Sequence, residues 1–157
     1  MDSTKRIALI AIGLFLGTVV TVLVVLRGGS LLAPDEPATV LALSDCDLQQ
    51  RPCSVTLPRG GVAELALVGR PVKPMQDFTL RLATDGIEVK KVLVSFTGVG
   101  MNMGLNRFAL RPAGDEWMGQ AILPICVRNR MEWEARLRLS TPQGVYEAPF
   151  RFATQKQ

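Results

Sequence analysis

The sequence predicts an all-β fold, an immunoglobulin-like antiparallel β-sandwich preceded by one N-terminal transmembrane helix. Residues 7–26 form an uncharged apolar run, and after residue 38 we find no helical periodicity of useful length. From there on, short apolar runs closed by turn residues recur every 8 to 12 residues or so, a spacing typical of a sandwich. The 157 residues leave room for one domain and an appendage. A small β-barrel is the alternative.

Residues 1–27 are predicted to be a membrane anchor. The uncharged run IALIAIGLFLGTVVTVLVVL would reach about 30 Å as a helix, which matches the bilayer hydrocarbon. A cleaved signal peptide is the alternative, but its apolar core is usually only about 7–15 residues long and ends at small residues, whereas Arg27 follows here. Because Lys5 and Arg6 outweigh Arg27, we expect a single-pass inner-membrane protein with a cytoplasmic N-terminus and a periplasmic C-terminal domain.

Residues 28–38, GGSLLAPDEPA, are predicted to be a flexible linker, because their glycines and prolines disfavour regular structure. Residues 39–157 would form the sandwich. Its predicted strands are residues 54–57, 62–68, 78–82, 87–97, 107–111, 117–123, 132–140 and 148–153. Turn residues separate several of them, as in Pro58-Arg59-Gly60-Gly61 and Asp85-Gly86. In residues 132–140, apolar odd positions alternate with charged even positions, which predicts one half-buried strand.

The three cysteines predict one disulfide. Cys46 and Cys53 bracket a short loop, and an oxidising compartment would allow them to pair. Cys126 is then left over. Three pairings are possible, and proximity alone favours this one. The alternative is that all three are buried thiols.

Composition excludes several classes of function. The chain has no histidine, so catalytic triads and zinc sites that use imidazole are ruled out. The net charge is +4, from 18 Lys and Arg against 14 Asp and Glu, but these charges are scattered and form no stripe with aromatic residues between them. We therefore expect no nucleic-acid partner and no enzyme activity.

A methionine-containing loop carries the most specific chemistry. Residues 98–106, GVGMNMGLN, follow a hydrophobic strand, and Met101 and Met103 are two apart, so in an extended segment their thioethers would project to one side. Soft sulfur donors favour Cu(I). Cys126 and Met131 could supply further sulfur ligands, and Met118 is a weaker candidate. The alternative is that these methionines only fill gaps in the core.

The segment from residue 92 to residue 139 resembles the methionine-rich core of membrane-anchored bacterial proteins of the FixH and YtkA-like families. The motifs that carry the resemblance are Met101-Asn102-Met103-Gly104, Gly114, Trp117, Leu123-Pro124 and Trp133, with Gly144 and Phe150 closing the match. The resemblance implies an immunoglobulin-like sandwich that supplies copper to haem-copper respiratory oxidases or helps to assemble them. Many YtkA-like proteins contain histidines that this chain lacks, which leaves a sulfur site suited to Cu(I).

We therefore expect a membrane-tethered periplasmic protein that binds Cu(I) and delivers it to a haem-copper oxidase subunit or another copper-handling protein. The tether would restrict the search for that partner to the membrane plane. The alternative is a metal-free interaction module, or accessory subunit of a membrane complex, in which the same loop docks a partner through adaptable methionine side chains.

Overall fold

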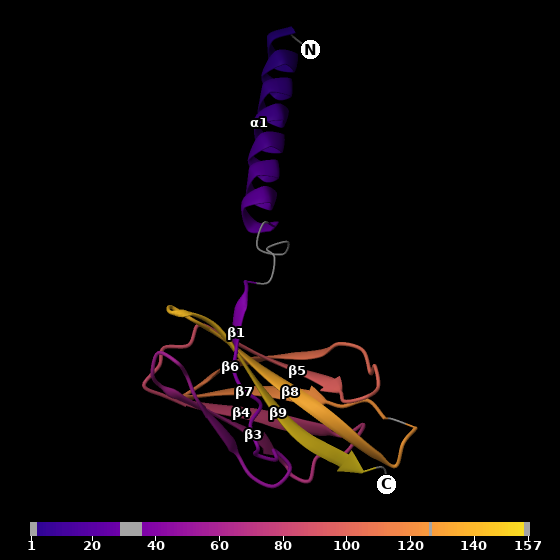
Figure 1. Cartoon of the computed structure of the whole chain (residues 1–157). Coiled ribbons are helices and arrows are strands. Elements are labelled where there is room, and N and C mark those ends of the chain that lie inside the picture. The colour runs from indigo at the N-terminus through magenta and orange to yellow at the C-terminus, as the bar shows by residue number, and fades with distance from the viewer. Residues whose placement is uncertain (1–2, 29–35, 126, 156–157) are drawn as a thin grey trace. The chain divides into compact units, whose positions relative to one another are not determined.

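A computed structural model describes residues 3–28, 36–125 and 127–155 of the chain (Figure 1). In the N-terminal helix, side chains are described for residues 11–23. The chain divides into two compact units, Met1–Glu36 and Pro37–Gln157. We call the second unit the β-domain.

The first unit contains the helix α1, Ser3–Gly28, which includes the predicted uncharged run. Its side chains from residue 11 to residue 23 are exposed. Within the described part of the chain, no helix is found that is both long enough and apolar enough to cross a membrane. The transmembrane anchor therefore stays a prediction.

The β-domain is all-β, as the sequence predicts. The described residues form nine strands: β1 Ala38–Val40, β2 Cys53–Thr56, β3 Val62–Val68, β4 Asp77–Asp85, β5 Lys91–Gly98, β6 Asn106–Ala113, β7 Glu116–Ile122, β8 Arg130–Thr141 and β9 Gly144–Gln155. Each of the eight predicted strands overlaps one of them. The short β1 was not predicted, and β5 begins four residues later than the predicted 87–97 run.

The strands form one hydrogen-bonded sheet in the order β1-β9-β8-β5-β6-β7-β4-β3-β2. β6 joins its two halves, because residues 106–110 pair with β5 whereas residues 111–113 pair with β7. The halves β1-β9-β8-β5 and β7-β4-β3-β2 lie in two layers (Figure 1). All neighbouring strands are antiparallel except β1, which runs parallel to β9 at one edge of the sheet.

Both halves contribute to one hydrophobic core. Phe96 of β5 makes an edge-to-face contact with Phe78 of β4, at a ring-centroid distance of 5.9 Å, and a similar contact with Phe152 of β9 at 5.8 Å. Trp133 of β8 is fully buried, and its indole N–H donates a hydrogen bond to Thr154 Oγ1 at 3.0 Å. The aromatic side chains therefore connect the two layers.

The alternation predicted for residues 132–140 is confirmed and extends along β8. Residues 131, 133, 135, 137 and 139 are buried, while the residues between them face outward. β8 is paired along its length with β9 and over residues 133–140 with β5. The register of this central strand thus decides which side chains enter the core and which line the outer surface.

The predicted disulfide between Cys46 and Cys53 is also confirmed, with a Cα–Cα distance of 5.7 Å. It attaches the loop before β2 to the buried start of that strand. Gln49 in the same loop hydrogen-bonds backbone groups of both layers: its amide N–H donates to Val72 O at 2.9 Å and to Ala153 O at 3.1 Å. The sequence pattern alone did not identify this role of Gln49.

Candidate functional site

The methionine-containing loop lies between the end of β5 and the start of β6. Local hydrogen bonds shape it: Gly104 N donates to Asn102 Oδ1 at 2.9 Å, and Asn106 Nδ2 donates to Met103 O at 3.2 Å. At the start of the loop, Val99 N donates to Glu132 O on β8 at 2.9 Å. These contacts hold the loop beside the beginning of β8.

Met101 and Met103 are half-buried and pack against the core, while Asn102 between them is exposed. Both methionines therefore face the domain interior, in line with their spacing of two. Their side chains are thus partly covered, although they lie on a loop between two strands. Partial burial limits the directions from which an ion or a partner can reach the sulfur atoms.

Met131, near the start of β8, is buried beside the same loop, with 3% of its surface exposed. A Cβ added to Gly98 would overlap Met131 Cε and would lie 2.9 Å from Met103 Cγ and 2.6 Å from the carbonyl oxygen of Met101. Side-chain atoms of Met131 and Met103 and the backbone carbonyl of Met101 thus meet at the place where Gly98 has no side chain. We call Met101, Met103 and Met131 the methionine cluster.

The pairing of β5 with β8 explains why the cluster forms. Gly98 is the last residue of β5 and lies opposite Trp133 of β8, so Met131 comes just beyond the last residue pair. The loop that follows Gly98 then turns back over the same end of the domain. Sequence analysis placed Met131 among the candidates, but it missed Gly98, whose role depends on a close approach between distant segments.

The other predicted ligands have different outcomes. Cys126 lies outside the described residues. Met118, the weaker candidate, is on β7 opposite Arg81, where it lines a groove on the outer surface of the other half of the sheet. The structure therefore does not bring Met118 to the methionine cluster.

The cluster offers neutral, soft donors. Thioethers carry no titratable proton in the physiological range, so a metal ion that binds to them releases no proton. Among the described residues, no group of three or more His, Cys, Asp or Glu side chains is placed to hold a metal ion. Thioether sulfur is the kind of donor that suits a soft ion such as Cu(I).

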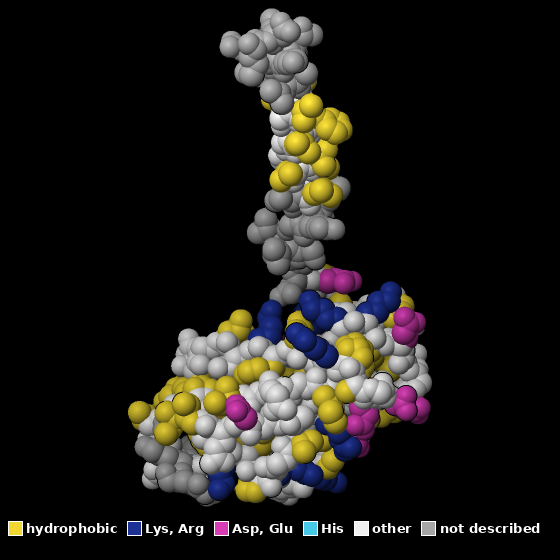
Figure 2. Space-filling view, turned by 180° about the vertical axis from the view of Figure 1, so that it is seen from behind, with side chains coloured by type: hydrophobic (Ala, Val, Ile, Leu, Met, Phe, Trp, Pro, Cys, Tyr) yellow, Lys and Arg dark blue, Asp and Glu magenta, His cyan; other side chains and the backbone are white. Residues whose placement is uncertain are grey.

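An exposed apolar surface lies at the end of β7. It comprises Met75, Ile122, Ile125 and Val127, of which Val127 is the most exposed at 85%. Met75 N donates a hydrogen bond to Leu123 O at 2.8 Å, which brings the segment before β4 beside the end of β7. Figure 2 shows hydrophobic side chains gathered at one end of the β-domain. We call these four residues the apolar end.

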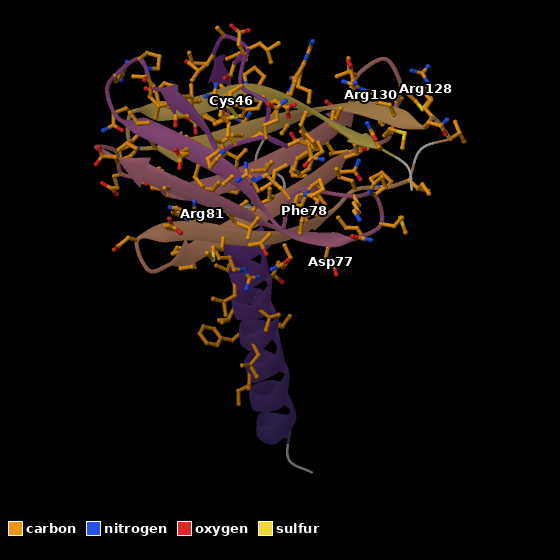
Figure 3. All side chains as sticks on the ribbon, turned by 90° about the horizontal axis from the view of Figure 1, so that it is seen from below. Cys46, Asp77, Phe78, Arg81, Arg128 and Arg130 are labelled. Carbon is orange, nitrogen blue, oxygen red and sulfur yellow. A yellow bond between two sulfur atoms is a disulfide. The ribbon has the colours of Figure 1, made fainter. Side chains whose placement is uncertain are left out.

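Two arginines accompany this region. Arg128 and Arg130 are both exposed and lie at the same end of the β-domain (Figure 3). Arg130 forms a loose ion pair with Glu132 at 3.8 Å. Such an exposed pair contributes little to stability.

No known protein-family model matches the chain, and no curated protein is similar to it at a significant level. The resemblance to the FixH and YtkA-like families therefore stays a prediction.

The site generates a prediction about Gly98. Replacing Gly98 by Ala should lower the free energy of unfolding by about 1–3 kcal/mol, because the new methyl group overlaps Met131 and crowds Met103. Thermal and denaturant unfolding would measure the loss.

The matched control introduces the same change into a Met131→Ala background. There the cost of Gly98→Ala should be smaller, since the overlapping Met131 Cε is gone. An equal cost in both backgrounds would contradict the close approach.

Proposed function

We propose that this chain is a membrane-tethered extracytoplasmic protein that binds Cu(I) through its methionine cluster and passes the ion to a copper-handling partner. The observation that carries the proposal is that the side chains of Met103 and Met131 meet at Gly98, while Met101, whose backbone carbonyl lies at the same place, packs its side chain against the same core. Met101 and Met103 lie two residues apart on one loop, whereas Met131 lies on β8. The fold therefore brings together methionines that are distant in the sequence.

The donor set fits Cu(I). Thioethers are soft ligands, and soft ligands favour Cu(I) over the harder divalent ions. Copper is here the cargo of the protein. Cys126 stands five residues before Met131 in the segment that leads into β8 and is a further sulfur donor that would strengthen such a site.

The burial of the cluster suits a carrier. Met131 is buried in the core, whereas Met101 and Met103 are half-buried on a loop. A partner could therefore reach the ion from the side of the loop, while Met131 remains fixed by β8. Passing an ion to a partner requires no covalent bond in a substrate to be broken, so we propose that the protein is a carrier and not an enzyme.

The tether and the compartment are proposed from the sequence and the disulfide. Residues 7–26 carry no charge, and Lys5 and Arg6 precede them, which favours an inner-membrane anchor with the β-domain on the periplasmic side. The Cys46–Cys53 disulfide is compatible with an oxidising compartment. The sheet has two halves, one with the strand order β9-β8-β5 and the other with the order β3-β4-β7, and β1 runs parallel to β9. This arrangement supports an immunoglobulin-like sandwich.

The proposed partner is a haem-copper oxidase subunit or another copper-handling protein, which follows from the family resemblance alone. A second candidate function is a metal-free interaction module. The apolar end favours it, because clustered exposed apolar side chains commonly mark protein contacts. In that case the methionine cluster would act only as packing beneath a docking surface.

Replacing both Met101 and Met103 by Leu separates the two functions. Leucine keeps a similar apolar volume but removes both sulfur atoms, so the cost in stability should stay below about 1.5 kcal/mol. Cu(I) affinity should fall by more than about tenfold. Competition with a Cu(I) chelator, under reducing conditions, measures the affinity, and thermal melts measure folding.

Met118→Leu is the matched control, since it removes one thioether from β7 away from the cluster. Its Cu(I) affinity should equal that of the wild type. Equal affinity in the wild type and the double variant would reject the copper function and favour the interaction module. A collapsed melt of the double variant would show that the two methionines are needed mainly for the core.

The tether is tested by topology. A reporter that is active only in the periplasm, fused after Gln157, should be active in a Gram-negative host. Deleting residues 7–26 should abolish this activity, because the anchor that exports the β-domain is gone. Activity only of a cytoplasmic reporter at the same position would contradict both the orientation and the proposed compartment.

A further inference from the structure

The outer surface of the half β7-β4-β3-β2 carries a groove that the copper function does not use. Its volume is about 800 Å³, which lies within the range of ligand pockets. Part of its lining is a row across three strands, in which Ala66 of β3 is paired with Arg81 of β4, and Arg81 with Met118 of β7. Residues 49, 50 and 52, before β2, and residues 68–71, at the end of β3 and beyond it, also line the groove.

The groove presents apolar side chains on the outer face of the sheet. Ala63, Leu65 and Leu67 of β3 belong to the hydrophobic core, so the residues that alternate with them face outward. Val68 on this outer face is 45% exposed, and Met118 is 40% exposed. Two large apolar side chains therefore lie open to solvent in the same groove.

Most polar side chains of the groove already have partners. The side-chain amide of Gln49 makes three hydrogen bonds to backbone groups, and Gln50 Nε2 donates to Asp47 Oδ2 at 3.1 Å. Arg81, labelled in Figure 3, has its Nη1 at 3.4 Å from Glu116 Oε1. These three side chains are therefore not counted as available to a ligand.

Arg70 is the charged group that remains available. Its side chain is exposed, and in the part of the chain that the structure describes no hydrogen bond or ion pair engages it. Among the described residues that line the groove, none is an Asp or a Glu. Because a guanidinium is always protonated in proteins, the groove has one uncompensated positive charge beside an apolar surface.

We propose that this groove binds an amphiphile with one carboxylate and an acyl chain, such as a medium-chain fatty acid. The carboxylate pairs with Arg70, whose planar fork of donors matches its two oxygens. The acyl chain covers Val68 and Met118 and removes their apolar surface from water. This site does not include the methionine cluster, so the proposal does not depend on Cu(I) binding.

A peptide segment fits this surface less well than an acyl chain. Each residue of a peptide brings a backbone N–H and a C=O that need partners, whereas the amide groups of Gln49 and Gln50 are already engaged. An acyl chain has no such groups. Its single carboxylate needs one cationic partner, which Arg70 supplies.

The test uses the full chain in nonionic detergent micelles. Octanoate is the probe, octanol is its uncharged reference, and an acetylated tripeptide with a free leucine carboxylate represents a peptide ligand. Binding is followed by NMR shifts of the backbone amides of β3, β4 and β7. Saturable shifts are expected with octanoate and not with the tripeptide. Partition of a probe into the micelles is the same for every variant, so it cancels when variants are compared.

Variants locate the binding. Arg70→Gln should weaken octanoate binding by about fivefold, the value of one partly exposed ion pair, and should leave octanol binding unchanged. Met118→Gln keeps the side-chain length but makes its end polar, so it should weaken the binding of both probes.

Arg59→Gln is the charge-matched control. Arg59 is exposed and lies in the turn before β3, at the opposite end of that strand from Arg70, so this variant should bind octanoate like the wild type. All three replaced side chains are exposed, and folding should therefore be retained.

No saturable shift with octanoate would overturn the proposal. Equal weakening by Arg70→Gln and Arg59→Gln would also overturn it, since only net charge would then matter. Unchanged octanoate binding in both Arg70→Gln and Met118→Gln would exclude this groove as the binding site. Saturable binding of the tripeptide without binding of octanoate would assign the groove to a protein partner instead.

Discussion

The pairing of β8 between β5 and β9 is the constraint on which the rest of the β-domain depends. Its alternation places Trp133 and four other buried residues in the core and every intervening side chain outside. Because the side-chain period of a strand is two, a slip of one residue would exchange the two faces. The Trp133 hydrogen bond to Thr154, inside the core, favours the observed register over a slipped one.

One register therefore positions two chemically different surfaces. On the inner face it brings Met131 beside Gly98, where the absence of a side chain admits the methionine-containing loop. On the outer face it aligns Arg136 with Ser95 and Arg138 with Leu93. The methionine cluster and the row of charged side chains on the outer face are both consequences of the same strand pairing.

Local patterns in the sequence were sufficient to predict most of the strands, but they were insufficient to predict how the methionine cluster is assembled. Alternation and turn residues identified eight strands, and the short spacing of Cys46 and Cys53 identified their disulfide. β1 was missed because three residues are too few to show a period, and its pairing with β9 is a nonlocal contact. The need for glycine at position 98 could not be predicted from the sequence either. It depends on a close approach of Met131, which lies 33 positions further along the chain.

The central claim is that three particular methionines bind Cu(I) together, and methionine methyl NMR tests it most directly. The chain contains six methionines, each of which gives one methyl signal after ¹³C labelling. On addition of one equivalent of Cu(I), we expect the signals of Met101, Met103 and Met131 to shift together, while those of Met75 and Met118 stay in place. Unchanged signals for the three, or equal shifts for all of the methionines, would contradict it.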